Sequence, residues 1–66
     1  MTLTVNGETR EVAAGTTLAS LLETLGVRRD GTAVALNEDV VPRTEHLRTV
    51  LRDGDRLEII VAVAGG

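Results

Sequence analysis

The stretch that decides the fold is a leucine-rich segment, Thr17-Leu18-Ala19-Ser20-Leu21-Leu22-Glu23-Thr24-Leu25-Gly26. Its four leucines recur at i, i+3, i+4 and i+7, the spacing of one apolar stripe along an α-helix. Thr16 or Thr17 is suited to cap the start of this helix, and Gly26 stands where a glycine commonly ends one. The segment therefore predicts a helix over about residues 17–25, whose leucines supply the main part of the core.

The residues before this helix predict a β-hairpin. Leu3 and Val5 alternate with polar residues over 2–6, and residues 8–13 supply a return strand. Between the two strands stands Asn6-Gly7, a pair that tolerates the positive φ angles of a type I′ turn. We expect the chain to begin with two antiparallel strands.

Three more strands are expected after the helix. Short apolar runs occur at 33–36 and at 40–41, where Pro42 ends the second, and a longer strand is expected over 56–63 after an Asp53-Gly54 turn. Between them, Thr44 is suited to cap a single helical turn over 45–48. In that turn Leu47 is expected to face inward and His46 to lie on the surface.

The element order predicts an α+β fold. A hairpin, a crossing helix and further strands produce a mixed sheet of four to five strands, with the helix packed on one face and the first and last strands parallel at its centre. This is the ubiquitin-like β-grasp arrangement. We expect one domain over residues 1–66, with a flexible C-terminal tail at about 62–66.

Composition excludes several functional classes. The chain has 66 residues, no cysteine, one histidine and a net charge of −3. Without cysteine there is no cysteine nucleophile, and a single histidine cannot form a metal site. The negative net charge argues against a surface for nucleic acid. We expect no bound cofactor. The longest apolar run, Ile59 to Ala64, is far shorter than the about 20 residues of a membrane span. No basic, apolar leader begins the sequence, so a cytoplasmic protein is expected. Because no Ser/His/Asp arrangement and no cysteine nucleophile are present, we expect no enzymatic activity.

The tail is where chemistry is expected. Ala64-Gly65-Gly66 leaves the last strand and ends in a carboxylate. A carboxylate must be activated, for example by adenylation with ATP, before a nucleophile attacks it. Glycine has no Cβ, so Gly65 and Gly66 fit a narrow enzyme channel in which larger residues clash. Ile60, the large apolar residue on the otherwise polar face of the last strand, is a candidate docking residue, although single exposed apolar residues are common.

Four segments together make the chain resemble the ThiS-type sulfur carriers of thiamine biosynthesis. They are Gly15-Thr16-Thr17-Leu18, Ala35-Leu36-Asn37-Glu38-Asp39-Val40-Val41-Pro42-Arg43, Asp53-Gly54-Asp55-Arg56-Leu57-Glu58-Ile59-Ile60 and Val63-Ala64-Gly65-Gly66.

The resemblance implies that a ThiF-type enzyme adenylates Gly66 with ATP. Sulfur, ultimately from cysteine, then gives a thiocarboxylate, and a ThiG-type thiazole synthase receives this sulfur. Ala64 and Gly65 would give slim access, and Ile60 and Val63 would contact the partners.

Three alternatives share parts of this pattern. The small subunit of molybdopterin synthase has the same kind of fold and tail, but it usually runs longer. A ubiquitin-like modifier would form isopeptide bonds to target lysines; the chain has no lysine of its own, which excludes only self-linked chains. A plain β-grasp interaction module would have no tail chemistry.

Overall fold

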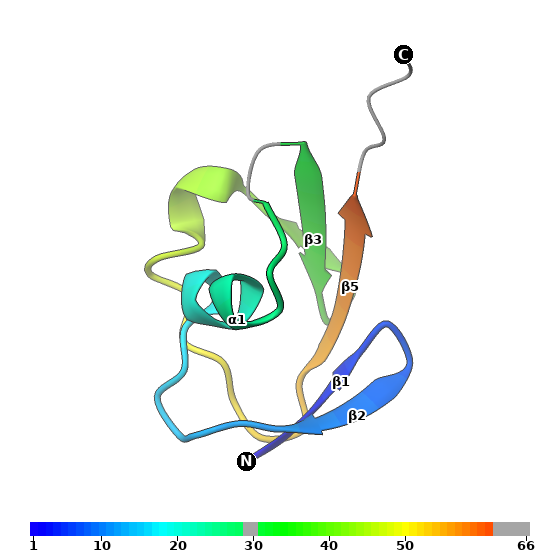
Figure 1. The fold of residues 1–66 in the computed structure, drawn as a ribbon, viewed down its shortest axis with the longest axis vertical. Helices are drawn as coiled ribbons and strands as arrows, with labels where there is room; N and C mark the ends of the chain where they lie inside the picture. The colour runs from blue at the N-terminus through cyan, green and yellow to red at the C-terminus, as the bar shows by residue number, and fades with distance from the viewer. Residues whose placement is uncertain (29–30, 62–66) are drawn as a thin grey trace.

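The computed structural model describes residues 1–28 and 31–61. The elements, in chain order, are β1 (Thr2–Val5), β2 (Glu8–Glu11), α1 (Leu18–Thr24), β3 (Thr32–Leu36), β4 (Asp39–Val41), the 3-10 turn η1 (Arg43–Glu45) and β5 (Arg56–Val61). The five strands form one mixed sheet in the order β2-β1-β5-β3-β4. Helix α1 packs against one face of this sheet (Figure 1). The expected α+β, β-grasp architecture is confirmed.

The N-terminal hairpin has the turn that Asn6-Gly7 predicts. Both residues have positive φ angles, 49° and 82°, and Val5 pairs directly with Glu8 across the two-residue turn. These are the features of a type I′ turn, whose twist suits the flanking strands. The return strand β2 ends at Glu11, two residues earlier than predicted.

Helix α1 begins and ends within a residue of the prediction. The Thr17 side chain accepts a hydrogen bond from the Ser20 N–H at 3.1 Å, which makes Thr17 the N-cap. Gly26 follows the helix with a φ of 71°. Val27 N–H donates to the Leu22 carbonyl, and Gly26 N–H donates to that of Glu23, both at 3.0 Å. This double hydrogen bond is a Schellman motif, in which glycine meets the left-handed conformation without steric cost.

The core lies between α1 and the facing side of the sheet. Three leucines of the predicted stripe are buried and the fourth, Leu25, is partly buried. The clustered core side chains are Leu3, Val5, Leu18, Leu21, Leu22, Val34, Leu51, Leu57 and Ile59. Strands β1 and β5 pair in parallel at the centre, through Thr4–Arg56 and Val5–Leu57, as expected. Aliphatic packing across this layer holds the sheet and the helix together.

The segment after β4 differs from the prediction. The helical turn is a 3-10 turn that follows Pro42, without a side-chain cap, so the expected Thr44 cap over 45–48 is wrong. Leu47 is 69% exposed rather than inward, and His46 is 1% exposed rather than on the surface.

The reason for this difference is a long-range contact with α1. The first N–H groups of a helix have no partner within it. Here the Leu18 N–H donates to the Thr49 carbonyl at 2.8 Å, and the Ala19 N–H donates to the His46 carbonyl at 3.1 Å. These bonds press the segment against the helix start and direct the His46 side chain inward. Its Nε2 donates to the Val41 carbonyl at 3.2 Å, while its buried Nδ1 has no partner among the described residues.

The approach to β5 contains the expected turn. Gly54 has a φ of 85°, and its N–H donates to the Thr2 carbonyl at 2.8 Å. Strand β5 is described as far as Val61, so the predicted extension to Val63 lies outside the described residues. Within the described part of the chain, no helix has the length and apolar character needed to cross a membrane.

Candidate functional site

Strand β5 presents different residues on its two faces. Leu57 and Ile59 face α1 and are core residues, whereas Arg56, Glu58 and Ile60 are exposed on the outer face. The alternation is the one that the sequence predicts. Ile59 is the last core residue of the strand, and Val61, which pairs with Thr32, is already 55% exposed. Among the described residues of β5, Ile59 is therefore the last one that contributes to the core.

The predicted tail residues lie beyond this point. Val63, Ala64, Gly65 and Gly66 are outside the described residues, and their roles stay predictions. Ile60 is described, and its expected exposure on the outer face is confirmed at 61%. The N-terminus lies at the bottom of the view in Figure 1, and β5 runs upward, so its carboxyl end points away from the N-terminus.

Ile60 is accompanied by apolar neighbours that sequence reasoning did not find. Ala33 lies directly opposite Ile60 across the β3–β5 pair, and Ala35 lies opposite Val40 across the β3–β4 pair. Val40 is 74% exposed. We call these four residues, Ala33, Ala35, Val40 and Ile60, the outer apolar patch. Only the pairing register brings them together, because Val40 and Ile60 are twenty residues apart in the chain.

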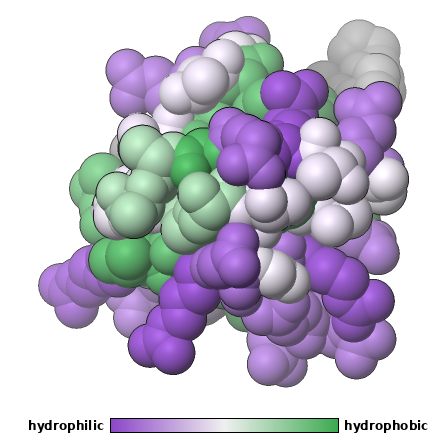
Figure 2. Space-filling view, turned by 90° about the horizontal axis from the view of Figure 1, so that it is seen from below, coloured by the Kyte–Doolittle hydropathy of each residue, from purple (hydrophilic) through white to green (hydrophobic). Residues whose placement is uncertain are grey.

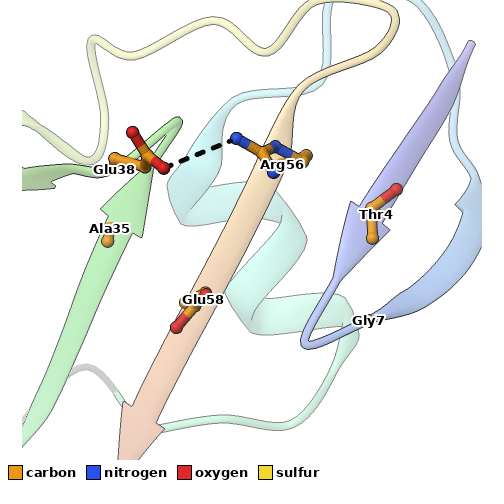
Figure 3. Close-up of a pocket in the computed structure, with 6 residues that line it drawn as sticks. All are labelled: Thr4, Gly7, Ala35, Glu38, Arg56 and Glu58. Carbon is orange, nitrogen blue, oxygen red and sulfur yellow. Dashed lines mark ion pairs between the residues drawn. The ribbon is translucent and has the colours of Figure 1, made fainter.

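A shallow hollow of about 460 Å³ lies beside this patch on the outer face (Figure 3). Its lining residues come from β1, β5, β3 and the turns that follow β1 and β3; they are Thr4, Gly7, Ala35, Glu38, Arg56 and Glu58. Arg56 pairs with Glu38 at 3.8 Å, and both side chains are largely exposed. Such a pair contributes little to stability because water screens it. With one arginine and two glutamates, the hollow gives the patch a net acidic border.

The opposite side of the molecule has a separate apolar surface. Seen from below, hydrophobic side chains gather on the side where Figure 1 shows α1 and the connection from η1 to β5, while hydrophilic residues cover most of the rest (Figure 2). Leu47 and Val50, both exposed, belong to that connection. This surface is distinct from the outer apolar patch, because Leu47 borders α1 and Ile60 faces away from it.

The described part of the chain offers little for catalysis or metal binding. Residues 1–28 and 31–61 contain no group of three histidine, cysteine, aspartate or glutamate side chains that could hold a metal ion. His46, the residue that follows η1, is 1% exposed, so its ring is out of reach of solvent. What the described residues provide is an exposed apolar patch on the outer face of the sheet, with Ile60 one residue before the last described residue of β5.

The fold is that of a β-grasp protein. Its marks are the strand order β2-β1-β5-β3-β4, the helix α1 on one face of the sheet, and the last strand of the chain at the centre. The ThiS family model matches residues 3–66. The chain belongs to the ThiS family, which confirms the resemblance inferred from its sequence.

Individual relatives agree with this assignment. The chain is 36% identical over 66 residues to the sulfur carrier protein ThiS of Escherichia coli, covering 100% of both proteins. Its structure matches that of a thiamine biosynthesis protein (ThiS) from Geobacter metallireducens with a TM-score of 0.85, 35% identity and full coverage of both chains. It is also 39% identical over 66 residues to a thiazole synthase of Paramagnetospirillum magneticum. The chain spans 20% of that longer protein.

Proposed function

We propose that Gly66 carries sulfur as a C-terminal thiocarboxylate. As a member of the ThiS family, the chain is a sulfur carrier of thiamine biosynthesis and not an enzyme. The observation that carries the assignment to Gly66 is that the family match runs through residue 66 and so includes both terminal glycines. The outer apolar patch at the end of β5 supports it, because a carrier must be recognised next to its reactive group.

The chemistry has two steps, and other proteins perform both. The Gly66 carboxylate attacks the α-phosphate of ATP on a ThiF-type adenylating enzyme, which releases pyrophosphate and leaves an acyl-adenylate. A sulfur nucleophile, supplied from cysteine by a donor system, then displaces AMP and leaves sulfur on the glycine carbonyl. The small side chains of Ala64 and Gly65 admit the carboxylate to the active-site channel. The chain binds no cofactor in this scheme, and the cytoplasm, where ATP is present, is the compartment we propose.

Partner docking is assigned to the outer apolar patch, with Val63 as a further contact nearer the tail. Exposed apolar side chains bordered by charge are a common composition for a transient interface. The net charge of −3 and the acidic border of the hollow favour a partner with a basic rim, which speeds association more than it raises affinity. Because one tail enters one channel at a time, the adenylating enzyme and the sulfur acceptor bind in turn.

The sulfur acceptor we propose is a ThiG-type thiazole synthase. The match to one fifth of the P. magneticum thiazole synthase supports this choice, because a carrier-like segment is joined to a synthase in a single chain there. Membership of the ThiS family favours the thiazole route over the two other chemistries that the residues left open, molybdopterin synthesis and lysine modification.

Intact-mass spectrometry tests the assignment to Gly66. The chain is incubated with ATP, a ThiF-type enzyme and a cysteine-derived sulfur source. We expect a mass increase equal to the replacement of one carboxylate oxygen by sulfur, located at Gly66 by fragmentation. A variant with one alanine appended after Gly66 is the control, and it should stay unloaded. Sulfur loading of the extended variant, or an unchanged mass of the natural chain, would contradict the proposal.

A further inference from the structure

Two asparagine side chains hold β5 from its two sides. Asn6 follows β1 and Asn37 follows β3, and both have positive φ angles, 49° and 50°. Asparagine tolerates this left-handed conformation better than most residues. In each case the side chain turns back and accepts a hydrogen bond from the backbone of β5: Asn6 from Ile59 at 2.7 Å and Asn37 from Arg56 at 2.9 Å.

The Asn6 side chain continues the parallel ladder where the backbone of β1 leaves it. Regular bonds run from the Thr4 N–H to the Asp55 carbonyl at 3.0 Å and from the Asn6 N–H to the Leu57 carbonyl at 2.9 Å. The next bonds of a regular ladder would join Ile59 N–H to the Asn6 carbonyl, and the N–H of residue 8 to the Ile59 carbonyl. The hairpin turn carries both backbone groups away. Asn6 Oδ1 and Nδ2 replace them, and Nδ2 donates to the Ile59 carbonyl at 3.3 Å.

This replacement occurs near the carboxyl end of the described part of β5. Pairing of β1 with β5 ends at Val5–Leu57, while pairing of β3 with β5 continues to Thr32–Val61. Without the Asn6 amide, the strand beyond Leu57 would be held on one side only. Ile60, in the outer apolar patch, comes directly after the bonded residue.

We propose that Asn6 is a positioning residue for activation of the tail: its side-chain amide fixes β5 at Ile59, and with it the orientation of Ile60 and the point from which the chain continues to Gly66. This inference rests on the proposed function. Ile60 follows directly on the residue that Asn6 holds, so loss of the amide would displace this exposed side chain relative to a partner. Misplacement by about 1 Å at a residue remote from the reacting atoms is enough to slow a reaction that depends on alignment.

Asn37 provides the matched control. It has the same residue type, the same left-handed turn and a similar side-chain bond to β5, but it bonds to Arg56, the first residue of the strand. In addition, the backbone of Asn37 bonds to β5, because its N–H donates to the Arg56 carbonyl at 2.8 Å. This backbone bond remains when the side chain is removed. Glycine at either position keeps the positive φ and removes only the amide.

The experiment compares Asn6→Gly with Asn37→Gly as substrates of the ThiF-type enzyme, measured by pyrophosphate release. Both are assayed at a temperature at which circular dichroism shows them folded. We expect Asn6→Gly to lower kcat/KM by roughly fivefold or more and Asn37→Gly by less than about twofold. Amide hydrogen exchange at 59–61 should speed up in Asn6→Gly only. Asn6→Asp, which keeps the acceptor but sets a carboxylate oxygen against the Ile59 carbonyl, should also lower kcat/KM.

The outcomes separate this inference from the function on which it rests. If the natural chain is not adenylated at all, the proposed function fails and the inference falls with it. If the natural chain is adenylated and the two glycine variants match each other in kcat/KM, the role of Asn6 is structural only and the inference is overturned. The same conclusion follows if exchange at 59–61 is unchanged in Asn6→Gly.

Discussion

Replacing Ile60 by alanine tests whether the outer face of β5 is the surface that partners bind. Ile60 is 61% exposed in the free domain, so the change removes apolar surface without opening the core. The folded state should lose little, since exposed strand positions respond by about 1 kcal/mol or less. The effect of the substitution should therefore fall on partner binding.

The size of the effect follows from the exposed fraction. Full burial of an isoleucine side chain contributes about 1.5–3 kcal/mol. Scaled by the part of Ile60 that a partner can still cover, the docked complex should lose about 1–2 kcal/mol. Since each 1.4 kcal/mol is a factor of ten, kcat/KM for adenylation should fall by about 5- to 30-fold. The change should be mostly in KM, because Ile60 does not touch the reacting carboxylate.

Steady-state pyrophosphate release with a ThiF-type enzyme measures this effect, and Leu47→Ala is the matched control. Leu47 is 69% exposed but borders α1 on the other side of the molecule. We expect that variant to change kcat/KM by no more than about twofold. Equal losses in the two variants, or no loss in Ile60→Ala, would show that the outer apolar patch is not the docking surface.

Two further predictions concern stability, measured by urea unfolding. His46→Ala should lower the free energy of unfolding by about 2–4 kcal/mol, because it empties a buried site and leaves the Val41 carbonyl without its donor; a loss below about 0.5 kcal/mol would mean that the ring is at the surface. Thr17→Ala should cost about 1 kcal/mol, because Ser20 N–H loses its acceptor. Thr17→Ser should stay near the natural value, and equal losses in both Thr17 variants would refute the capping role.

Elements whose determinants are local could be predicted from the sequence. The type I′ turn depends on Asn6-Gly7 alone, and α1 depends on a cap, four leucines and Gly26, all within ten residues. The parallel pairing of β1 with β5 followed from the element order, because a β-grasp topology leaves few alternatives. For the site, the exposure of Ile60 was predictable from the alternation of β5 with period two.

Features set by contacts between distant segments could not be predicted. The inward position of His46 depends on hydrogen bonds from Leu18 and Ala19, which lie about thirty residues earlier in the chain. A pattern confined to residues 42–49 favours Leu47 as the inward residue, because hydropathy alone ranks leucine above histidine. Val40 and Ile60 lie on the same face of the sheet only because of the register in which β3 pairs with β4 and with β5. The bonds of Asn6 to Ile59 likewise require knowing where β1 ends against β5.

The position of β5 in the sheet bears on how one small domain can combine stability with presentation of the reactive end that we propose at Gly66. It lies in the middle of the order β2-β1-β5-β3-β4, so opening it means breaking pairs on both sides, and central strands are among the last parts of a domain to open. Changes remote from β5, such as those at Thr17, should therefore alter the fraction of folded carrier without altering kcat/KM of the folded form. The change Ile60→Ala should do the reverse: it should lower kcat/KM and leave the fraction of folded carrier nearly unaltered. A carrier whose stability and recognition separate in this way can meet successive enzymes without any rearrangement of its core.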